Sequence, residues 1–209
     1  VDAPSPDHVT GAAPASTVSL AEPDAALEKF LSGLGVKIAA SDDGSSPILC
    51  APIGEDATSV AVRTGADHRR LVAIDLSADI SKRITIMTAP GADAAARDSV
   101  AALLAKDGCK VTAIKDSPGF IAQRIRAMIG NLSCEMAQIG LASPEEIDLA
   151  MTLGLNYPQG PLAMVDAMGT GATLRVLDQL QALTGEDRYR PSLWLRRRAL
   201  LGLSAKTAG

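Results

Sequence analysis

The pattern of apolar residues changes once along the chain, near Lys115, and this change limits the fold more than any other feature. Before it, short β-branched runs such as ILCAPI, LVAIDL, ITIM and KVTAI lie between turn residues and predict strands. After it, apolar residues recur every three or four positions, which is typical of amphipathic helices. We therefore expect an α/β unit over residues 24–115 and an all-α domain over residues 116–209.

The α/β unit is expected to begin with a helix over residues 24–34, and two further strands are predicted at VKIA and TSVAVR. Between the last two strands lies the helix former DAAARDSVAALLAK, so this strand–helix–strand order predicts a parallel crossover. Residues 1–23 are rich in Pro, Ala, Ser and Asp and are expected to form a flexible linker, because they bury too little apolar surface to order themselves. A linker here suggests that a further domain precedes it, and trimming of a longer chain explains it equally well.

The first helix of the second half is expected to begin at Ser117-Pro118, an N-cap followed by a proline in the first helical position. Its apolar residues recur at helical spacing up to Gly140 and predict one long helix with a buried stripe. The residues of this predicted stripe are Ile121, Ile125, Met128, Leu132, Met136 and Ile139.

A capping box at Ser143-Pro144-Glu145-Glu146 predicts the start of the next helix, which should end at Gly154. Residues 156–161 contain two prolines and a glycine and predict a turn. Further helices are expected at residues 162–168, 172–183 and 191–203.

Charge and cysteine content narrow the class of protein. The formal net charge is −4 and no basic stripe is concentrated anywhere, which argues against a nucleic acid as the main partner. No apolar run approaches the ~20 residues that a membrane span requires. Cys50, Cys109 and Cys134 are odd in number and lack metal-ligand spacing, so we expect no metal site and a reducing, cytoplasmic location.

The helical half resembles the C-terminal domain of the 3-hydroxyacyl-CoA dehydrogenase family, on two blocks of residues. The first is Asp116-Ser117-Pro118-Gly119-Phe120 with Arg124, which is similar to that family's junction between the cofactor domain and the helical domain. The second block comprises Ala142-Ser143, Ile147-Asp148, Ala150-Met151, Gly154, Tyr157-Pro158, Gly160-Pro161-Leu162 and Asp166.

A second resemblance is to the extreme C-terminus of the long bacterial members of this family, which carry the helical domain twice. It rests on Asn156-Tyr157-Pro158, Glu186, Arg188-Tyr189-Arg190-Pro191, Leu193, Arg196 and Arg198-Ala199-Leu200. The segment LVAIDLSADISKRITIM looks like the degenerate half-domain before the second copy. The resemblance thus implies a degenerate Rossmann-like domain at residues 24–115, followed by a helical domain of the family's C-terminal type at residues 116–209.

This resemblance implies a parent enzyme that oxidises (S)-3-hydroxyacyl-CoA to 3-oxoacyl-CoA with NAD, in the degradation of fatty acids or aromatic acids. In that family the helical domain shapes the acyl pocket and carries much of the homodimer interface, so acyl-CoA and a second copy are the implied partners. Two other hypotheses stay open: a non-catalytic assembly or dimerisation module, and an independent acyl-CoA binder.

The chain lacks the glycine-rich turn with which a Rossmann domain binds the pyrophosphate of NAD after its first strand. The one candidate is Gly33-Leu34-Gly35, which precedes a strand and has Ile38 where the third glycine would lie. We interpret this pair of glycines as the end of a helix. We therefore expect no cofactor-binding residues in this chain, and no NAD bound to it.

The family's catalytic base is a His in an HFFNP-like stretch, oriented by a Glu further along the chain. Counting back from Pro118-Gly119-Phe120 places these two positions near Ala73 and Thr85. Neither side chain can take up a proton at neutral pH, so we expect no catalytic residue and an inactive isolated chain. His68 lies close in the sequence, but its charged neighbours predict a solvent-exposed loop, and His8 lies in the expected linker.

Two residues of the junction are candidate substrate-binding residues, Gln123 and Arg124. The family has an Asn before the arginine, and Gln123 keeps an amide donor one methylene further out. The simpler interpretations are an ordinary polar helix residue and a salt bridge within the helical domain. Five arginines near the C-terminus could contact CoA phosphates, although a solvated helix face is the simpler interpretation. They are Arg188, Arg190, Arg196, Arg197 and Arg198.

Overall fold

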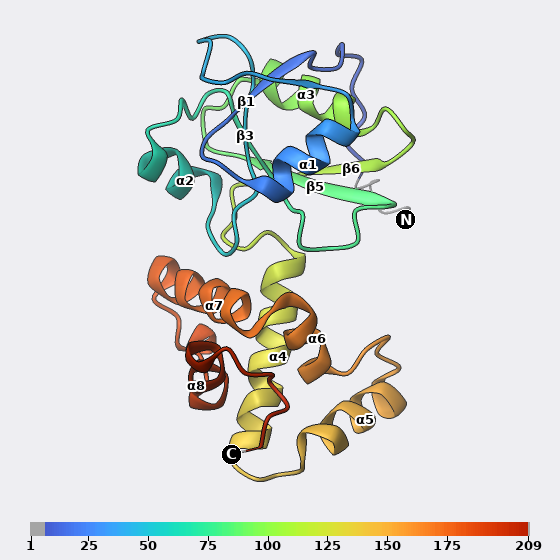
Figure 1. The fold of residues 1–209 in the computed structure, drawn as a ribbon, viewed down its shortest axis with the longest axis vertical. Coiled ribbons are helices and arrows are strands. Elements are labelled where there is room, and N and C mark those ends of the chain that lie inside the picture. The colour runs from blue at the N-terminus through green and yellow to red at the C-terminus, as the bar shows by residue number, and fades with distance from the viewer. Residues whose placement is uncertain (1–6, 209) are drawn as a thin grey trace, which may run out of the picture. The chain divides into compact units, whose positions relative to one another are not determined.

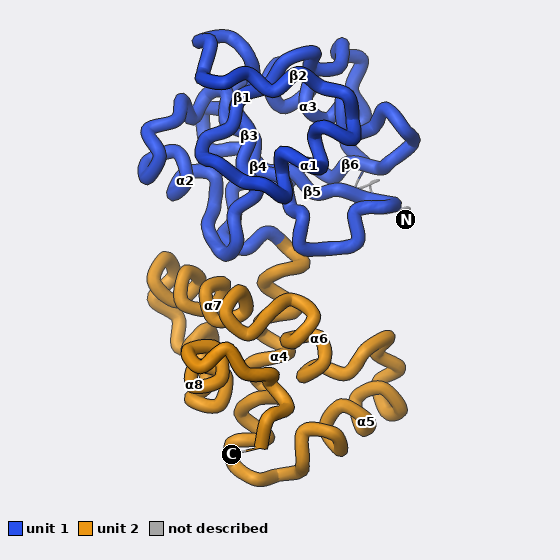
Figure 2. The backbone as a smooth tube through the Cα atoms, viewed as in Figure 1, with its two compact units in different colours: residues 1–120 blue, residues 121–209 orange. Residues whose placement is uncertain are grey.

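The chain divides into two compact units, the first ending at Phe120 and the second beginning at Ile121 (Figure 2). The computed structural model describes residues 7–208. The first unit contains strands and helices and the second contains helices, which confirms the predicted fold class.

A six-stranded sheet forms the centre of the first unit (Figure 1). Its strands are β1 (Thr17–Leu20), β2 (Lys37–Ile38), β3 (Ile48–Cys50), β4 (Leu71–Ile74), β5 (Arg83–Thr88) and β6 (Lys110–Lys115), and its helices are α1 (Ala25–Gly33), α2 (Ala57–Thr64) and α3 (Ala94–Leu104). The strand order is β2-β1-β3-β4-β5-β6. Every neighbouring pair is parallel except β4 and β5, and α3 makes the predicted crossover between β5 and β6.

Side chains alternate between the two faces of this sheet and form two separate cores. On one face, α1 and α3 pack against strand residues such as Leu49, Val72 and Ile86. On the other face, α2 and Phe120 pack against the alternate positions, among them Ala73. The last residue of the first unit is therefore anchored in its core.

The strand predicted for TSVAVR is wrong, because this segment forms helix α2. The carboxylate of Asp56 accepts the backbone N–H of Ser59 at 2.7 Å, and Gly65 ends the helix with a φ of 73°. The buried residues of the helix are Ala57, Val60 and Ala61. Their helical spacing and the two caps outweigh the β-propensity of the valines.

The structure differs from the flexible linker expected over residues 1–23. Thr17–Leu20 forms β1, and Val18 is fully buried there. Upstream of β1, the backbone N–H of His8 donates to the carbonyl of Val111 at 2.6 Å. Backbone hydrogen bonds thus order a segment whose side chains bury little apolar surface. Residues 1–6 of the expected linker lie outside the described residues.

The second unit is built around one long helix, α4, which contacts the other four helices of the unit (Figure 1). The helices are α4 (Ala122–Gln138), α5 (Pro144–Leu155), α6 (Pro161–Met168), α7 (Thr170–Thr184) and α8 (Leu193–Leu201), with a 3-10 turn, η1 (Asp187–Tyr189), before α8. The predicted capping box of α5 is confirmed: the Ser143 hydroxyl accepts from the Glu146 N–H, and the Glu146 carboxylate accepts from the Ser143 N–H. The helix ends at Leu155, one residue beyond the predicted Gly154.

Helix α4 begins later than predicted. Gly119 and Phe120 both have left-handed backbone angles, with φ of 69° and 48°, and this turn separates Ser117-Pro118 from the helix. A left-handed residue cannot continue a right-handed helix, so Ser117 is not its N-cap. The helix starts at Ala122 instead.

The apolar stripe predicted to be buried on α4 is largely exposed. Ile121, Ile125, Leu132 and Ile139 are 50–68% exposed. The face that packs inside the unit consists of small residues, including Ala127, Gly130, Cys134 and Ala137. Small side chains allow neighbouring helices to approach closely, so the larger apolar residues are left on the outer face.

Candidate functional site

The register between β4 and β5 decides whether the two expected catalytic positions, Ala73 and Thr85, lie opposite each other. Ala73 lies opposite Met87 and is fully buried in the core beneath α2. The carbonyl of Thr85 instead accepts the backbone N–H of Asp75 at 2.9 Å. The structure therefore does not bring Ala73 and Thr85 together, because the connection between two antiparallel strands fixes their register.

Asp75 is a buried titratable residue that sequence reasoning missed. It follows β4 directly and is 3% exposed. Its carboxylate accepts the hydroxyl of Ser77 at 2.6 Å and the backbone N–H of Ser77 at 3.0 Å. Its sequence signal was a single acidic residue that closes the apolar run LVAI. The β4–β5 pair thus carries a carboxyl group near the expected site, with a serine beside it.

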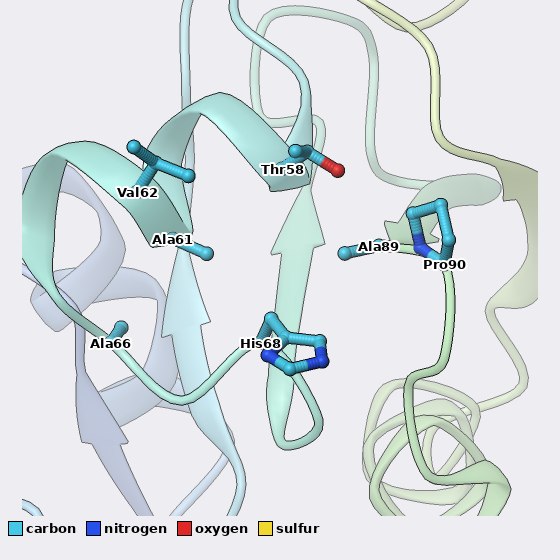
Figure 3. A pocket seen from close by; sticks show the side chains of 7 residues that line it. All are labelled: Thr58, Ala61, Val62, Ala66, His68, Ala89 and Pro90. Atoms are coloured by element: carbon cyan, nitrogen blue, oxygen red, sulfur yellow. The ribbon is translucent and has the colours of Figure 1, made fainter.

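The two histidines occupy different surroundings. His68 is exposed on the loop before β4, as predicted (Figure 3). His8 is half-buried and its Nε2 lies 2.9 Å from Asp98 Oδ1, so it does not belong to a free linker. The two rings line two different cavities of the first unit.

Gln123 and Arg124 both lie at the start of α4. Gln123 is completely buried and Arg124 is half-buried. The interpretation of Gln123 as an ordinary polar helix residue stays open, and its burial shows only that the side chain lies inside the unit. Their contact with substrate stays a prediction.

The residues that follow β1 do not fit the pyrophosphate of NAD. The turn from β1 to α1 reads Ala21-Glu22-Pro23-Asp24 and contains no glycine. The carboxylate of Asp24 accepts the first free amides of α1, from Ala26 and Leu27, both at 3.0 Å. A carboxylate therefore already occupies the helix end at which a Rossmann domain binds phosphate.

Gly33 and Gly35 lie where α1 ends, as the sequence predicts. Gly33 is the last residue of the helix, and Gly35 has a φ of 70° in the turn before β2. The interpretation as a helix end is confirmed. Among residues 7–208, no group of three or more His, Cys, Asp or Glu side chains could hold a metal ion.

The five C-terminal arginines do not form one solvated face. Arg198 is 6% exposed, and its guanidinium carbon lies 3.3 Å from the ring centroid of Trp194. Arg196 pairs with Asp178 at 2.6 Å. Arg188 pairs with Glu186, whereas Arg190 and Arg197 are exposed. The solvated-face interpretation is wrong for Arg198, since stacking and hydrogen bonds hold this residue in the interior.

Residues 203–208, the C-terminal tail, are fastened to the second unit by Trp194 and Arg198. The indole N–H of Trp194 donates to the carbonyl of Ala205 at 2.8 Å, and Arg198 donates to the carbonyl of Thr207 through Nε at 2.9 Å and through Nη2. The backbone N–H of Ala205 donates to the carboxylate of Asp166 at 2.6 Å. The tail is thus an integral part of the fold of this unit.

Asp148 on α5 caps the neighbouring helix α6. Its two carboxylate oxygens accept the backbone N–H groups of Leu162 at 2.7 Å and Ala163 at 3.1 Å. The ammonium of Lys206 in the tail lies 2.7 Å from the same carboxylate. Gly160 passes so close to Asp148 that an added Cβ would lie 2.3 Å from the carboxyl carbon. One buried carboxylate therefore joins α5, α6 and the tail.

The cysteines differ in their expected reactivity. Burial raises the pKa of the Cys134 thiol to about 12 and also raises that of Cys50, so neither is a thiolate near neutral pH. Cys109 is half-buried, and burial raises its pKa as well. We expect iodoacetamide to modify Cys109 of the native protein first, with Cys50 and Cys134 reacting only after unfolding. Peptide mass spectrometry checks this order, and equal native rates at Cys134 and Cys109 would contradict it.

Two families match consecutive parts of the chain, with a boundary at the end of the first unit. The family described as 3-hydroxybutyryl-CoA dehydrogenase reduced Rossmann-fold domain matches residues 49–118. The family described as 3-hydroxyacyl-CoA dehydrogenase, C-terminal domain, matches residues 119–209. The two matches together span residues 49–209, so the chain combines two domains of 3-hydroxyacyl-CoA dehydrogenases, the reduced Rossmann-fold domain and the C-terminal helical domain.

Curated relatives are dehydrogenases that are longer than this chain. The 3-hydroxyadipyl-CoA dehydrogenase of Escherichia coli K12 is 40% identical over 171 residues, which are 79% of this chain and 35% of the relative. A probable 3-hydroxybutyryl-CoA dehydrogenase of Deinococcus radiodurans is 38% identical over 94 residues, which are 45% of this chain and 34% of the relative. The chain thus spans about a third of the length of these relatives.

Solved structures of the family have the same fold. The 3-hydroxybutyryl-CoA dehydrogenase of Escherichia coli K12 is 38% identical with a TM-score of 0.67, over 78% of this chain and 34% of that one. The (S)-3-hydroxybutyryl-CoA dehydrogenase of Ralstonia eutropha is 24% identical with a TM-score of 0.71, over 93% of this chain and 71% of that one, and shows likeness of fold alone. Within residues 7–208, none of the helices has the length and apolar character needed to cross a membrane.

Proposed function

We propose that the protein to which this chain belongs is an NAD-dependent (S)-3-hydroxyacyl-CoA dehydrogenase, and that this half supplies the substrate-pocket and dimer scaffold. The observation that carries the proposal is the 40% identity to a 3-hydroxyadipyl-CoA dehydrogenase of which the chain spans 35%. The reaction converts (S)-3-hydroxyacyl-CoA into 3-oxoacyl-CoA, in the degradation of fatty or aromatic acids. Because the residues after β1 do not fit NAD, and Ala73 and Thr85 cannot take up a proton, the proposal assigns the cofactor and the catalytic base to the rest of the enzyme.

The role of this half in substrate binding would fall to the start of α4. The amide of Gln123 can donate a hydrogen bond to a carbonyl oxygen, and the guanidinium of Arg124 can neutralise negative charge. Gln123 is completely buried in this chain, so direct contact with substrate requires that its amide become accessible in the whole enzyme.

The exposed apolar stripe on α4 supports a role in assembly. Ile121, Ile125, Leu132 and Ile139 cover its outer face, and Leu153 on the adjoining α5 is 78% exposed. An exposed apolar surface of this kind is typical of protein–protein interfaces. A second copy of this chain, in a homodimer, is the proposed occupant.

Substitution of Leu132 by Glu is expected to convert the dimer into a monomer, because the interface would bury an unpaired charge. Sedimentation at high micromolar concentration measures the change. The matched control is Leu200→Glu, which places the same charge at an exposed leucine of α8 and should leave the dimer intact. A wild-type chain that stays strictly monomeric would contradict the proposed interface.

The proposed activity is tested by exchanging this chain for the matching part of the 3-hydroxyadipyl-CoA dehydrogenase of Escherichia coli. NADH oxidation with acetoacetyl-CoA is compared for this chain alone, for the relative without its matching third, and for a chimera in which this chain replaces that third. We expect activity in the chimera alone. In the chimera, Gln123→Ala should lower kcat/KM about tenfold, whereas Lys29→Ala on α1 should not. Turnover by the isolated chain, abolished by His68→Ala, would overturn the proposal.

A non-catalytic assembly module is the second candidate function. It is favoured by the exposed stripe on α4 together with the positions of Ala73 and Thr85, which can supply no base. Chimera activity that is unaffected by Gln123→Ala but lost with Leu132→Glu would favour this function over a substrate-pocket role.

An independent acyl-CoA binder has less support. Of the five arginines that could contact CoA, Arg196 and Arg198 are already engaged within the second unit. The three free cysteines support a reducing, cytoplasmic location for the enzyme.

A further inference from the structure

Two cavities of the first unit share lining residues, and neither is lined by the turn that follows β1. One has a volume of about 340 Å³ and the other of about 630 Å³. Ala89 and Pro90, which follow β5, line both of them, so this short segment forms a ridge between the two spaces.

The smaller cavity is apolar. Its lining residues are Thr58, Ala61, Val62, Ala66, His68, Ala89 and Pro90, and Figure 3 shows the side chain of Ala61 on α2 pointing toward Ala89, with the imidazole of His68 below the two. Small aliphatic walls with one aromatic ring suit a flat, largely apolar group such as a nucleobase. His68 can also donate or accept a hydrogen bond at the edge of that group.

The larger cavity carries cationic groups. Arg97 on α3 and Lys115 at the end of β6 line it together with His8. Asp98 holds two of these groups in place, because its Oδ1 lies 2.8 Å from Arg97 Nε and 2.9 Å from His8 Nε2. Lys115 is exposed, and among residues 7–208 it forms no ion pair. The guanidinium of Arg97 and the ammonium of Lys115 suit phosphate oxygens.

The one carboxylate that lines the larger cavity is already engaged. Asp116 accepts the backbone N–H groups of Ala57 and Thr58 at 2.7 and 3.1 Å, and also the hydroxyl of Thr58. Its charge is therefore directed at the start of α2, and the ammonium of Lys115 is left as a lining cation with no ion-pair partner among residues 7–208. The cavity also lies where the parallel strands β5 and β6 end, the edge of an α/β sheet at which ligands bind.

We infer that the two cavities together bind a nucleoside diphosphate, with the base in the smaller cavity and the phosphates in the larger one. The ridge at Ala89 and Pro90 would lie beneath the sugar. This site is separate from the turn after β1 that fails to fit NAD, and it does not depend on the proposed dehydrogenase activity of the whole enzyme.

Two histidine side chains can report ligand binding to the two cavities. The chain contains two histidines, His8 and His68, and each lines one of the two cavities. Their ring C–H signals in the NMR spectrum of the full chain can be followed during titration with ADP, adenosine or inorganic phosphate. We expect ADP to shift both signals along one saturable curve, adenosine to shift His68 alone, and phosphate to shift His8 alone.

Substitutions test the assignment of the phosphate group. Lys115→Ala should weaken ADP binding about fivefold and leave adenosine binding unchanged. The control is Lys29→Ala, a lysine on α1 that lines neither cavity, which should change neither affinity. The inference is overturned if millimolar ADP shifts neither histidine, if inorganic phosphate binds as tightly as ADP, or if Lys115→Ala leaves the affinity for ADP unchanged.

Discussion

Replacement of Gly160 by alanine is expected to destabilise the second unit by about 3 kcal/mol. The added Cβ would lie 2.3–2.6 Å from three atoms of Asp148, a distance that requires the aspartate to move. Asp148 cannot move freely, because its oxygens accept the first amides of α6 and bind Lys206. Displacement would leave buried amide groups without acceptors, which is among the costliest effects of a single substitution.

Urea unfolding followed by the fluorescence of Trp194 measures this loss, since the chain has one tryptophan and it lies in the second unit. Gly154→Ala is the matched control, because Gly154 lies within α5 and an added Cβ would meet nothing within 4 Å. That control should be neutral or stabilising by up to about 1 kcal/mol, as expected for alanine inside a helix. Equal stability of the two variants would show that Asp148 does not fix the start of α6.

Arg198→Ala is the second large effect, with an expected loss of about 2–4 kcal/mol in the free energy of unfolding of the second unit. The guanidinium stacks on Trp194 and donates to the carbonyls of Trp194 and Thr207. Its removal would leave the Thr207 carbonyl without these donors and release the C-terminal tail. Arg198→Lys should recover little of the loss, because an ammonium cannot stack and donate in the same fork.

The neighbouring residue provides the control for this prediction. Arg197 is exposed and adjacent in sequence, so Arg197→Ala should change stability by less than about 0.5 kcal/mol. Hydrogen exchange of the Ala205 amide, which donates to Asp166, reports whether the tail is released. Protection of that amide in Arg198→Ala equal to the wild-type value would contradict the proposed role of Arg198.

Much of the fold follows from apolar periodicity and capping residues. The strands at LVAIDL, ITIM and KVTAI and the capping box at Ser143 were predicted from local pattern alone. TSVAVR was misassigned because its valines favour a strand, and because Asp116, a distant residue, adds to the local caps by accepting the amides of Ala57 and Thr58. A single sequence shows no contact between positions so far apart.

The two faces of α4 illustrate a second limit of sequence reasoning. Periodicity identified the large apolar residues, and the natural expectation was that they form the core. The packed face consists instead of small residues such as Ala127 and Gly130, whose low hydrophobicity hides them from such a pattern. An apolar stripe therefore predicts that a surface is covered, and it leaves open whether the same chain covers it.

The candidate site was predicted less well than the fold. Counting along the chain selected Ala73 and Thr85, whereas the register places Asp75 beside Thr85. The length of the connection between β4 and β5 determines that register, and a count that assumes another length shifts the pairing. Asp75 was visible in the sequence only as one acidic residue, whereas Gln123 was selected as a candidate through the family resemblance, without any sign of its burial.

The strand order of the sheet has a consequence for synthesis of the chain. In the order β2-β1-β3-β4-β5-β6, each strand after the first pairs with one that precedes it in the sequence. A nascent chain can therefore extend its sheet at a free edge as it leaves the ribosome, and no strand has to be inserted between two others. Phe120 enters the core last, so the first unit can be complete before the helices of the second unit are translated.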